Sequence, residues 1–316
     1  MTVKSLKKRV GALPPAVWMI AVMLVFYGLN TKNYFTASNF ISILIQAAPL
    51  FVVACGQTII VLMQGTDLSL GASLNMMTVV WVVLMQKNLP IGIALPLAMG
   101  TSVFAGYLNG LIVAKMKLPP FIATLGMQNI LNSIALVTSN GSSVYHEHAI
   151  YKIIAKSSFL GIPYILWIAI GCFALTMVLL KFTRFGARVI SMGGNPESLK
   201  VAGYSPDLAT IQAFTYTGFM TAVAGFILAC RVESGNPIVG NGFEFNSVAA
   251  VLLGGTSMRE GRGGVGGTVF GVLLIQILKN GLVMMNVSSI YQTAIIGIVV
   301  LFAIMLDAYI KRRQEE

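Results

Sequence analysis

Long apolar stretches separated by short polar ones make up almost the whole of this chain. Most are long enough for a helix to cross a bilayer, which takes about 20 residues. The segments expected to form membrane helices are Leu13–Leu29, Asn39–Gln64, Leu68–Met85, Ile91–Ala114, Pro120–Thr138, Pro163–Phe182, Asp207–Cys230, Phe245–Ser257, Gly264–Met285 and Ile290–Ile310. The pattern predicts an all-α, polytopic membrane protein of about ten helices, forming a single transmembrane domain over residues 1–316. The segment 245–257 is short for a full crossing, so neighbouring helices must shelter it.

The polar insert at 184–206, which contains RFGARVISMGGNPESLKVAG, has the residue order of a capped helix. Gly193 and Gly194 allow a tight backbone reversal, and Gly203 suits a helix stop. Residues suited to a helix start follow the reversal, and they are Asn195, Pro196 and Glu197. Ser205, Pro206 and Asp207 repeat this order at the next membrane helix. The order predicts a helix of about two turns outside the membrane.

A second polar insert, 139–162, contains His146, Glu147 and His148. We expect a short surface helix in it. Two histidines at this spacing have no third ligand near them in the sequence, and no metal site is predicted.

Composition and charge support a membrane protein and give its orientation. Hydrophobic residues are 56% of the chain, charged residues 10%, and the mean hydropathy is +0.83, which excludes a soluble domain. The net charge of +11 comes from dispersed basic residues rather than from a nucleic-acid-binding face. With the N-terminus inside, the basic residues at outer ends are Lys32, Lys87, Lys152, Lys156, Arg231 and Lys279. The other 15 of the 21 lie inside, so residues 1–12, 184–206 and 311–316 are predicted to be cytoplasmic and 139–162 periplasmic.

Weak internal symmetry indicates two inverted repeats. The expected helices of 39–138 begin outside, whereas those of 207–310 begin inside. Asp67-Leu68-Ser69 opens a helix in the first half, and Glu244-Phe245-Asn246-Ser247 opens one in the second. Inverted repeats of this kind are typical of transporters.

Motifs for chemistry are absent from the sequence. It holds no catalytic signature, no phosphate loop and no cysteine spacing typical of zinc, so we expect no enzyme and no bound cofactor or metal. Any ATP must be handled by a partner chain. Asp67, Glu244, Lys279 and Asp307 fall near the expected helix ends, and charge-free helix centres argue against an ion-coupled carrier.

Neutral polar residues do occur in the middle of the expected helices. They are Gln46, Gln57, Gln128, Asn129, Asn132, Thr215, Thr217 and Gln276. Two interpretations remain open at this point. Each residue can hydrogen-bond between helices, or the set can line a route for a neutral hydroxylated solute.

Taken together, five short motifs resemble the permease subunit of bacterial ATP-binding-cassette importers for sugars, of the ribose, xylose, arabinose and galactoside type. The motifs are GTDLSLG at 65–71, PPFIATLG at 119–126, GGN at 193–195 with Gly203, GGTS at 254–257 and SSIYQ at 288–292. The resemblance covers nearly the whole chain. Such permeases commonly have Arg-Gly where this chain has Asn132-Ser133.

The resemblance implies a type II-like permease of the bacterial inner membrane, in a homodimer or a heterodimer with a related permease. Two ATPase subunits, which bind ATP and Mg²⁺, would attach below, and a periplasmic sugar-binding protein would dock above. Residues implied in the ATPase-coupling loop are Arg188, Gly193, Gly194, Asn195, Glu197 and Gly203. Residues implied along the translocation path are Gln46, Gln57, Phe121, Thr124, Gln128, Asn132 and Asn246. The alternative hypothesis is an ion-coupled secondary carrier of a small polar solute.

Overall fold

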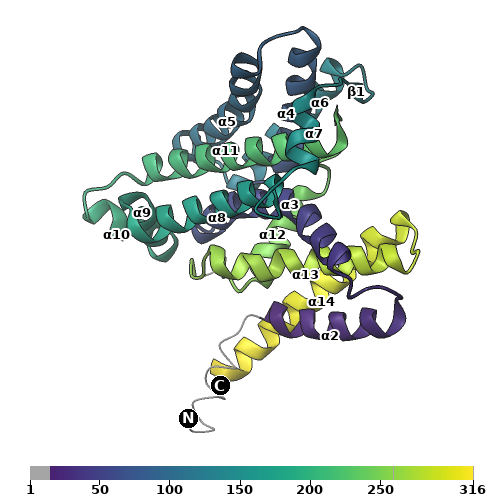
Figure 1. Ribbon diagram of the computed structural model, residues 1–316. Coiled ribbons are helices and arrows are strands. Elements are labelled where there is room, and N and C mark those ends of the chain that lie inside the picture. The colour runs from purple at the N-terminus through teal and green to yellow at the C-terminus, as the bar shows by residue number, and fades with distance from the viewer. Residues whose placement is uncertain (1–14, 259, 316) are drawn as a thin grey trace.

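The computed structural model describes residues 15–258 and 260–315. The expected cytoplasmic N-terminus, Arg259 and the last residue of the C-terminal tail lie outside the described residues. The described chain is nearly all helical. Its helices are α2 (Pro15–Asn30), α3 (Ala37–Leu62), α4 (Leu70–Gln86), α5 (Ile91–Met116), α6 (Pro120–Thr138), α7 (Ala149–Lys156), α8 (Tyr164–Phe182), α9 (Arg184–Gly194), α10 (Pro196–Val201), α11 (Pro206–Val232), α12 (Phe243–Leu253), α13 (Val265–Met284) and α14 (Ser289–Glu315) (Figure 1).

Each apolar segment expected from the sequence coincides with a helix. Within the described residues, 6 helices are long and apolar enough to cross a membrane: α3, α5, α6, α8, α11 and α13. Shorter apolar helices are Ala16–Asn30, Leu70–Gln86, Phe243–Leu253 and Ser289–Phe302. The chain is therefore a multi-pass membrane protein.

Helix α3 lies at the centre of the bundle. It packs against α8, α11, α12 and α13, and α11 also packs along α4 and α5 (Figure 1). Small residues allow the closest approaches, since a Cβ at Gly106 or Gly110 of α5 would collide with the backbone of α11. These two glycines, four residues apart, therefore allow α5 and α11 to pack closely.

Two small antiparallel strand pairs lie in and beside the 139–162 insert. β1 (Val144–Tyr145) pairs with β4 (Ser234–Gly235), and β2 (Ser158–Phe159) pairs with β3 (Ile162–Pro163). The expected surface helix is α7, whose N-cap is His148: its Nδ1 accepts a hydrogen bond from the Ile150 amide at 3.1 Å. Lys156 at the end of α7 forms an ion pair with Glu233 at 2.9 Å.

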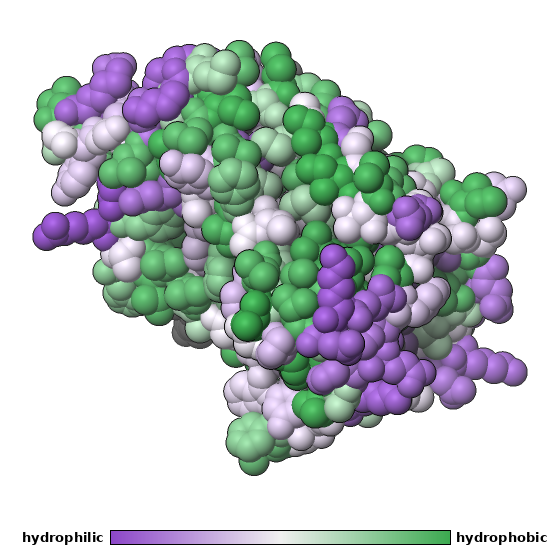
Figure 2. All heavy atoms as spheres, turned by 90° about the horizontal axis from the view of Figure 1, so that it is seen from above, coloured by the Kyte–Doolittle hydropathy of each residue, from purple (hydrophilic) through white to green (hydrophobic). Residues whose placement is uncertain are grey.

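The surface of the bundle is largely apolar. Figure 2 shows hydrophobic residues over most of the face in view, with hydrophilic residues gathered in separate clusters. Helices α5 and α8 expose large apolar side chains such as Leu97, Phe104, Ile170 and Val178. Such faces suit contact with lipid.

Candidate translocation path and coupling loop

Two non-helical segments interrupt the bundle where the sequence leads from one apolar helix to the next. The first break, 63–69, separates α3 from α4, and the second, 233–242, separates α11 from α12. Backbone groups at membrane depth must be hydrogen-bonded within the protein, because lipid offers no partners. Polar side chains of neighbouring helices supply these bonds in both breaks.

In the first break, Asp67 and Thr124 hold the start of α4. The Asp67 Oδ1 accepts hydrogen bonds from the backbone N–H of Ser69 at 2.9 Å and from its hydroxyl at 2.7 Å. The amide of Asn109 on α5 donates to the Ser69 Oγ at 2.8 Å. The Leu68 N–H donates to the Thr124 Oγ1 at 3.1 Å, which ties the break to α6. Thr124, which was expected along the path, is therefore a buried residue that holds the backbone of the first break.

In the second break, Asn75 of α4 replaces the missing backbone partners. Its side chain is fully buried, and its Oδ1 accepts a hydrogen bond from the Gly240 N–H at 2.6 Å. Its Nδ2 donates to the Asn241 Oδ1 at 2.9 Å and to the Asn132 Oδ1 at 3.3 Å. Asn75 was not among the residues expected from the sequence. A single amide within the apolar run of α4 could have indicated a buried hydrogen-bonding role.

Glu244 lies in the first turn of α12, as expected, but that helix start is not at the end of the bundle. The second break runs down beside α4 before α12 begins, which carries Glu244 to the level of Gln128, the ninth of the 19 residues of α6. Its Oε1 accepts hydrogen bonds from the Gly242 N–H at 3.2 Å and the Gln128 Nε2 at 3.3 Å. Its Oε2 lies against Gly71 in the first turn of α4 and has no hydrogen-bond partner among the described residues. The side chain is 5% exposed.

We call Asn75, Gln128, Asn132, Asn241 and Glu244 the half-depth cluster. Among the residues expected along the path, Gln128 and Asn132 belong to it, and Asn246 lies half-buried on the same helix as Glu244. Phe121 lies at the start of α6 and is 55% exposed.

Two of the expected path residues sit in other surroundings. Gln46 accepts a hydrogen bond from Gln276 at 3.2 Å and so links α3 to α13. Gln57 is fully buried in α3, and neither of its amide atoms has a hydrogen-bond partner among the described residues. The structure therefore brings Gln128 and Asn132 into one polar group but gives Gln46 and Gln57 separate positions.

The face of α6 and α12 that borders the half-depth cluster exposes polar side chains next to apolar ones such as Ile130 and Phe245. Asn129, Ser133 and Asn241 are exposed there, and Asn246 is half-buried. Polar residues at this depth are costly against lipid and normally face protein or water. This face contrasts with the apolar exposed faces of α5 and α8.

The expected reversal at Gly193 and Gly194 is wrong, because both residues end the helix α9. A Cβ at Gly193 would collide with the Leu62 carbonyl at the end of α3 and with Gly261. The Gln64 Nε2 also donates to the Gly193 carbonyl at 2.8 Å. Gly193 therefore serves close packing of α9 on α3, and the chain changes direction at Asn195, whose backbone is extended.

The rest of the capped-helix prediction is confirmed in α10. The Asn195 Oδ1 accepts a hydrogen bond from the Glu197 N–H at 2.9 Å. Gly203 has φ +80°, and its N–H bonds to the Lys200 carbonyl at 2.9 Å while the Tyr204 N–H bonds to the Leu199 carbonyl at 3.1 Å. This pair of bonds is a Schellman motif, which terminates the helix.

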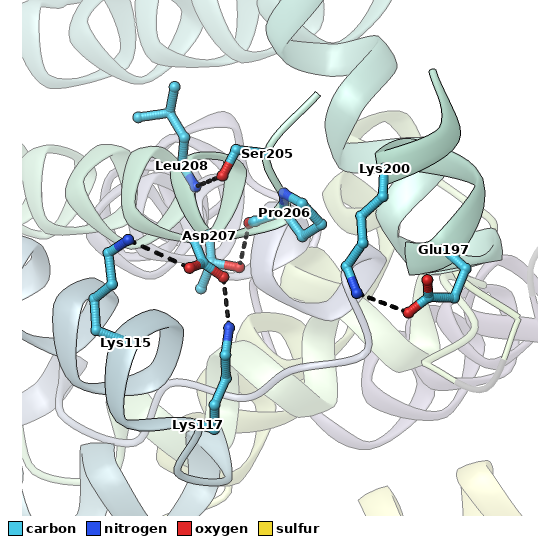
Figure 3. Close-up of polar contacts among 9 residues, drawn as sticks. Lys115, Lys117, Glu197, Lys200, Ser205, Pro206, Asp207 and Leu208 are labelled. Carbon is cyan, nitrogen blue, oxygen red and sulfur yellow. Dashed lines mark hydrogen bonds and ion pairs between the residues drawn. The ribbon is translucent and has the colours of Figure 1, made fainter. Parts of the chain in front are cut away.

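Charged residues join the C-terminal end of α5 to the N-terminal end of α11 beside this loop. Asp207 forms ion pairs with Lys115 at 3.3 Å and Lys117 at 2.6 Å, and Lys200 pairs with Glu197 at 2.8 Å (Figure 3). The lysine side chains are mostly exposed, so each pair is expected to contribute little to stability.

Apolar side chains are also exposed on the loop. Val201 is 89% exposed, Ile190 and Tyr204 are partly exposed, and the Arg188 guanidinium lies 5.8 Å from the centre of the Tyr204 ring. An exposed apolar surface outside the membrane is typical of a protein interface.

A bundle of apolar helices that is interrupted by two breaks, each held by polar side chains, is typical of membrane transport proteins. The chain belongs to the family described as the permease component of branched-chain amino acid transport systems, whose model matches residues 39–304. No solved structure matches the chain.

Several relatives that are similar in sequence are named as sugar permeases. The ribose import permease protein of Haemophilus influenzae is 31% identical over 92% of this chain and 91% of its own length. The ribose import permease protein of Escherichia coli K12 is 33% identical over 91% of both chains. The L-arabinose transport system permease protein of the same bacterium is 29% identical over 92% of this chain and 89% of its own.

Proposed function

We propose that this chain is the permease subunit of an ATP-binding-cassette importer and forms the path of a sugar or sugar-like solute across the bacterial inner membrane. The similarity to ribose and arabinose import permeases over about nine tenths of each chain carries the proposal. The half-depth cluster agrees with it, since amides and a carboxylate are suitable partners for hydroxyl groups.

Helix packing supports two inverted repeats, α3–α6 and α11–α14, within a ten-crossing topology. Helix α3, the first of one repeat, packs against α12 and α13 of the other. Helix α11, the first of the second repeat, packs against α4 and α5. The two breaks stand at equivalent positions, just before α4 and α12. Unwound segments at equivalent places in two repeats are a common location of a transport path.

The exposed polar residues next to the half-depth cluster, Asn129, Ser133 and Asn241, indicate where the path runs. A second permease copy, identical or related, would cover the face of α6 and α12 that borders the half-depth cluster and leave a polar route between the two subunits. Asn129 and Asn241 would then face that route rather than lipid.

The segment α9–α10 is proposed as the docking element for the separate ATPase. The exposed Val201 at the end of α10 and the exposed Tyr204 that follows it would contact the ATPase, which binds ATP and Mg²⁺. Movement of α9 would reach the membrane through Gly193, which packs on the end of α3 next to the first break. A rigid, capped helix is suited to transmit such a movement.

Reconstitution of the chain with its ATPase and its binding protein in proteoliposomes tests the proposal. Labelled D-ribose, L-arabinose and D-fructose would be offered, with L-leucine included because of the family's description. We expect uptake of at least one sugar that requires ATP and the binding protein. ATP-independent uptake driven by a proton or sodium gradient would instead support the ion-coupled carrier, and uptake of leucine alone would assign an amino acid substrate.

A further inference from the structure

Glu244 is an acid at half-depth in the bundle, and none of the ion pairs among the described residues includes it. The described residues of α4, α6 and α12 and the second break from 234 to 242 contain no other ionisable side chain. An ionisable residue at this depth normally has a function. The established hydrogen bonds of Glu244 account for Oε1 but leave the buried Oε2 unpartnered among the described residues.

Burial of Glu244 acts in favour of its neutral form, whereas its hydrogen-bond partners and the nearby helix ends act in favour of a carboxylate. Both groups that bond to its Oε1, the Gly242 N–H and the Gln128 amide, are donors. Glu244 lies in the first turn of α12, and its Oε2 lies against Gly71 in the first turn of α4. Two helix N-termini, each with a partial positive charge, therefore meet at this carboxylate.

The proposed path passes close to this charge. Gln128, which donates to Glu244, is half-buried on α6, and the exposed face of α6 and α12 is the proposed boundary of the route. The other members of the half-depth cluster are neutral amides. A solute at this level would therefore meet hydrogen-bonding groups together with one uncompensated negative charge per subunit.

Resting on the proposed function, we propose that Glu244 is the charge filter of the path and a specificity-determining residue. It admits uncharged, hydroxyl-bearing solutes and repels anions such as phosphorylated sugars. Repulsion between the Glu244 carboxylate and an anionic solute within several ångströms, in a site of low polarity, is strong enough to exclude the anion. The filter would also prevent phosphorylated sugars in the cytoplasm from leaving by the same route.

Thiol labelling tests the filter without any need for transport. Asn246→Cys would be made in the full chain, assembled with its ATPase in proteoliposomes. The native Cys55, Cys172 and Cys230 are all buried and serve as a silent background. Two methanethiosulfonate reagents of similar size would be compared, one with a trimethylammonium group and one with a sulfonate, and Ser142→Cys in the exposed outer loop gives the reference ratio of their rates.

We expect the cationic reagent to be favoured at Asn246→Cys by about tenfold or more over the reference ratio. Adding Glu244→Gln should return the ratio to the reference, Glu244→Asp should preserve the preference, and Glu233→Gln, an acid at the outer end, should leave it unchanged. An equal ratio at both cysteines would overturn the filter, as would a cysteine at 246 that reacts with neither reagent. If Glu244→Gln fails to assemble, the proposal is tested by the ratio of the two labelling rates at Asn246→Cys, compared with the ratio at Ser142→Cys, in the otherwise native chain. Absence of ATP-driven sugar uptake by the native complex would instead refute the proposed function.

Discussion

The coupling loop and the half-depth cluster are both polar interruptions of an apolar chain, but they are held in different ways. Bonds between residues that are neighbours in sequence form α10, as in the cap at Asn195 and the stop at Gly203. The half-depth cluster joins α4, α6 and the second break through Asn75, whose partners lie up to 166 positions away. Changes in the loop should therefore act locally, whereas changes in the cluster should weaken the whole bundle.

The largest effect is expected at Asn75. Asn75→Ala removes the acceptor of the buried Gly240 N–H and the donor to Asn132 and Asn241. An unsatisfied buried group costs about 1–3 kcal/mol, so we expect a loss of about 3 kcal/mol and a marked fall in Tm in detergent. Asn129→Ala is the matched control, because that exposed amide bonds to the Leu125 carbonyl of its own helix. Equal Tm values for the two variants would contradict a central role of Asn75.

Next in size is a change at the contact between α9 and α3. Gly193→Ala places a methyl group against the Leu62 carbonyl, and such overpacking costs about 1–3 kcal/mol. We expect ATP hydrolysis to continue while solute uptake per ATP falls severalfold. Gly194→Ala is the control, since a Cβ there meets nothing within 4 Å. Unchanged uptake per ATP in Gly193→Ala would contradict the proposed transmission of movement from α9 to α3 through Gly193.

A smaller effect is expected at the end of α10. A Cβ at Gly203 meets no neighbour within 4 Å, so the main cost of Gly203→Leu is the left-handed backbone, about 1–2 kcal/mol. Insertion into the membrane should be normal, and transport-coupled ATP hydrolysis should decrease. Ala202→Leu, at the exposed neighbouring position, should behave like the native chain. Normal coupling in Gly203→Leu would refute the importance of this helix stop.

The smallest effect is expected at the outer surface, where Lys156 binds Glu233. The hydrogen bond from Lys156 lowers the pKa of Glu233 below its usual value. A lowered folded-state pKa stabilises the fold above the unfolded pKa, and this contribution is lost as the pH falls through the folded value. The protection of the α7 amides, which is the intrinsic exchange rate relative to their observed rate at the same pH, should therefore decrease slightly on acidification. Glu233→Gln should show the lower protection already at neutral pH. Unchanged protection in that variant would contradict a stabilising role of the ion pair between Lys156 and Glu233.

The sequence was informative wherever structure is decided by near neighbours. The apolar helices, the cap at Asn195 and the stop at Gly203 follow from periodicity and from residue types at fixed offsets. Helix α9 was missed because its terminal glycines suggested a reversal, while their real cause, close contact of Gly193 with Leu62, is remote in sequence. The level of Glu244 beside Gln128 does not follow from the sequence for the same reason, because it depends on a non-helical segment bound to Asn75 of another helix.

The central claim is that the face of α6 beside the half-depth cluster lines a water-filled path. Accessibility of single cysteines to a water-soluble maleimide tests it most directly in the assembled complex. The account predicts that cysteines at Gln128 and Asn132 of α6 react, whereas cysteines at Ile170 and Val178, on the apolar face of α8, do not. Unreactive cysteines at both α6 positions would contradict the claim and place this face against lipid or dry protein.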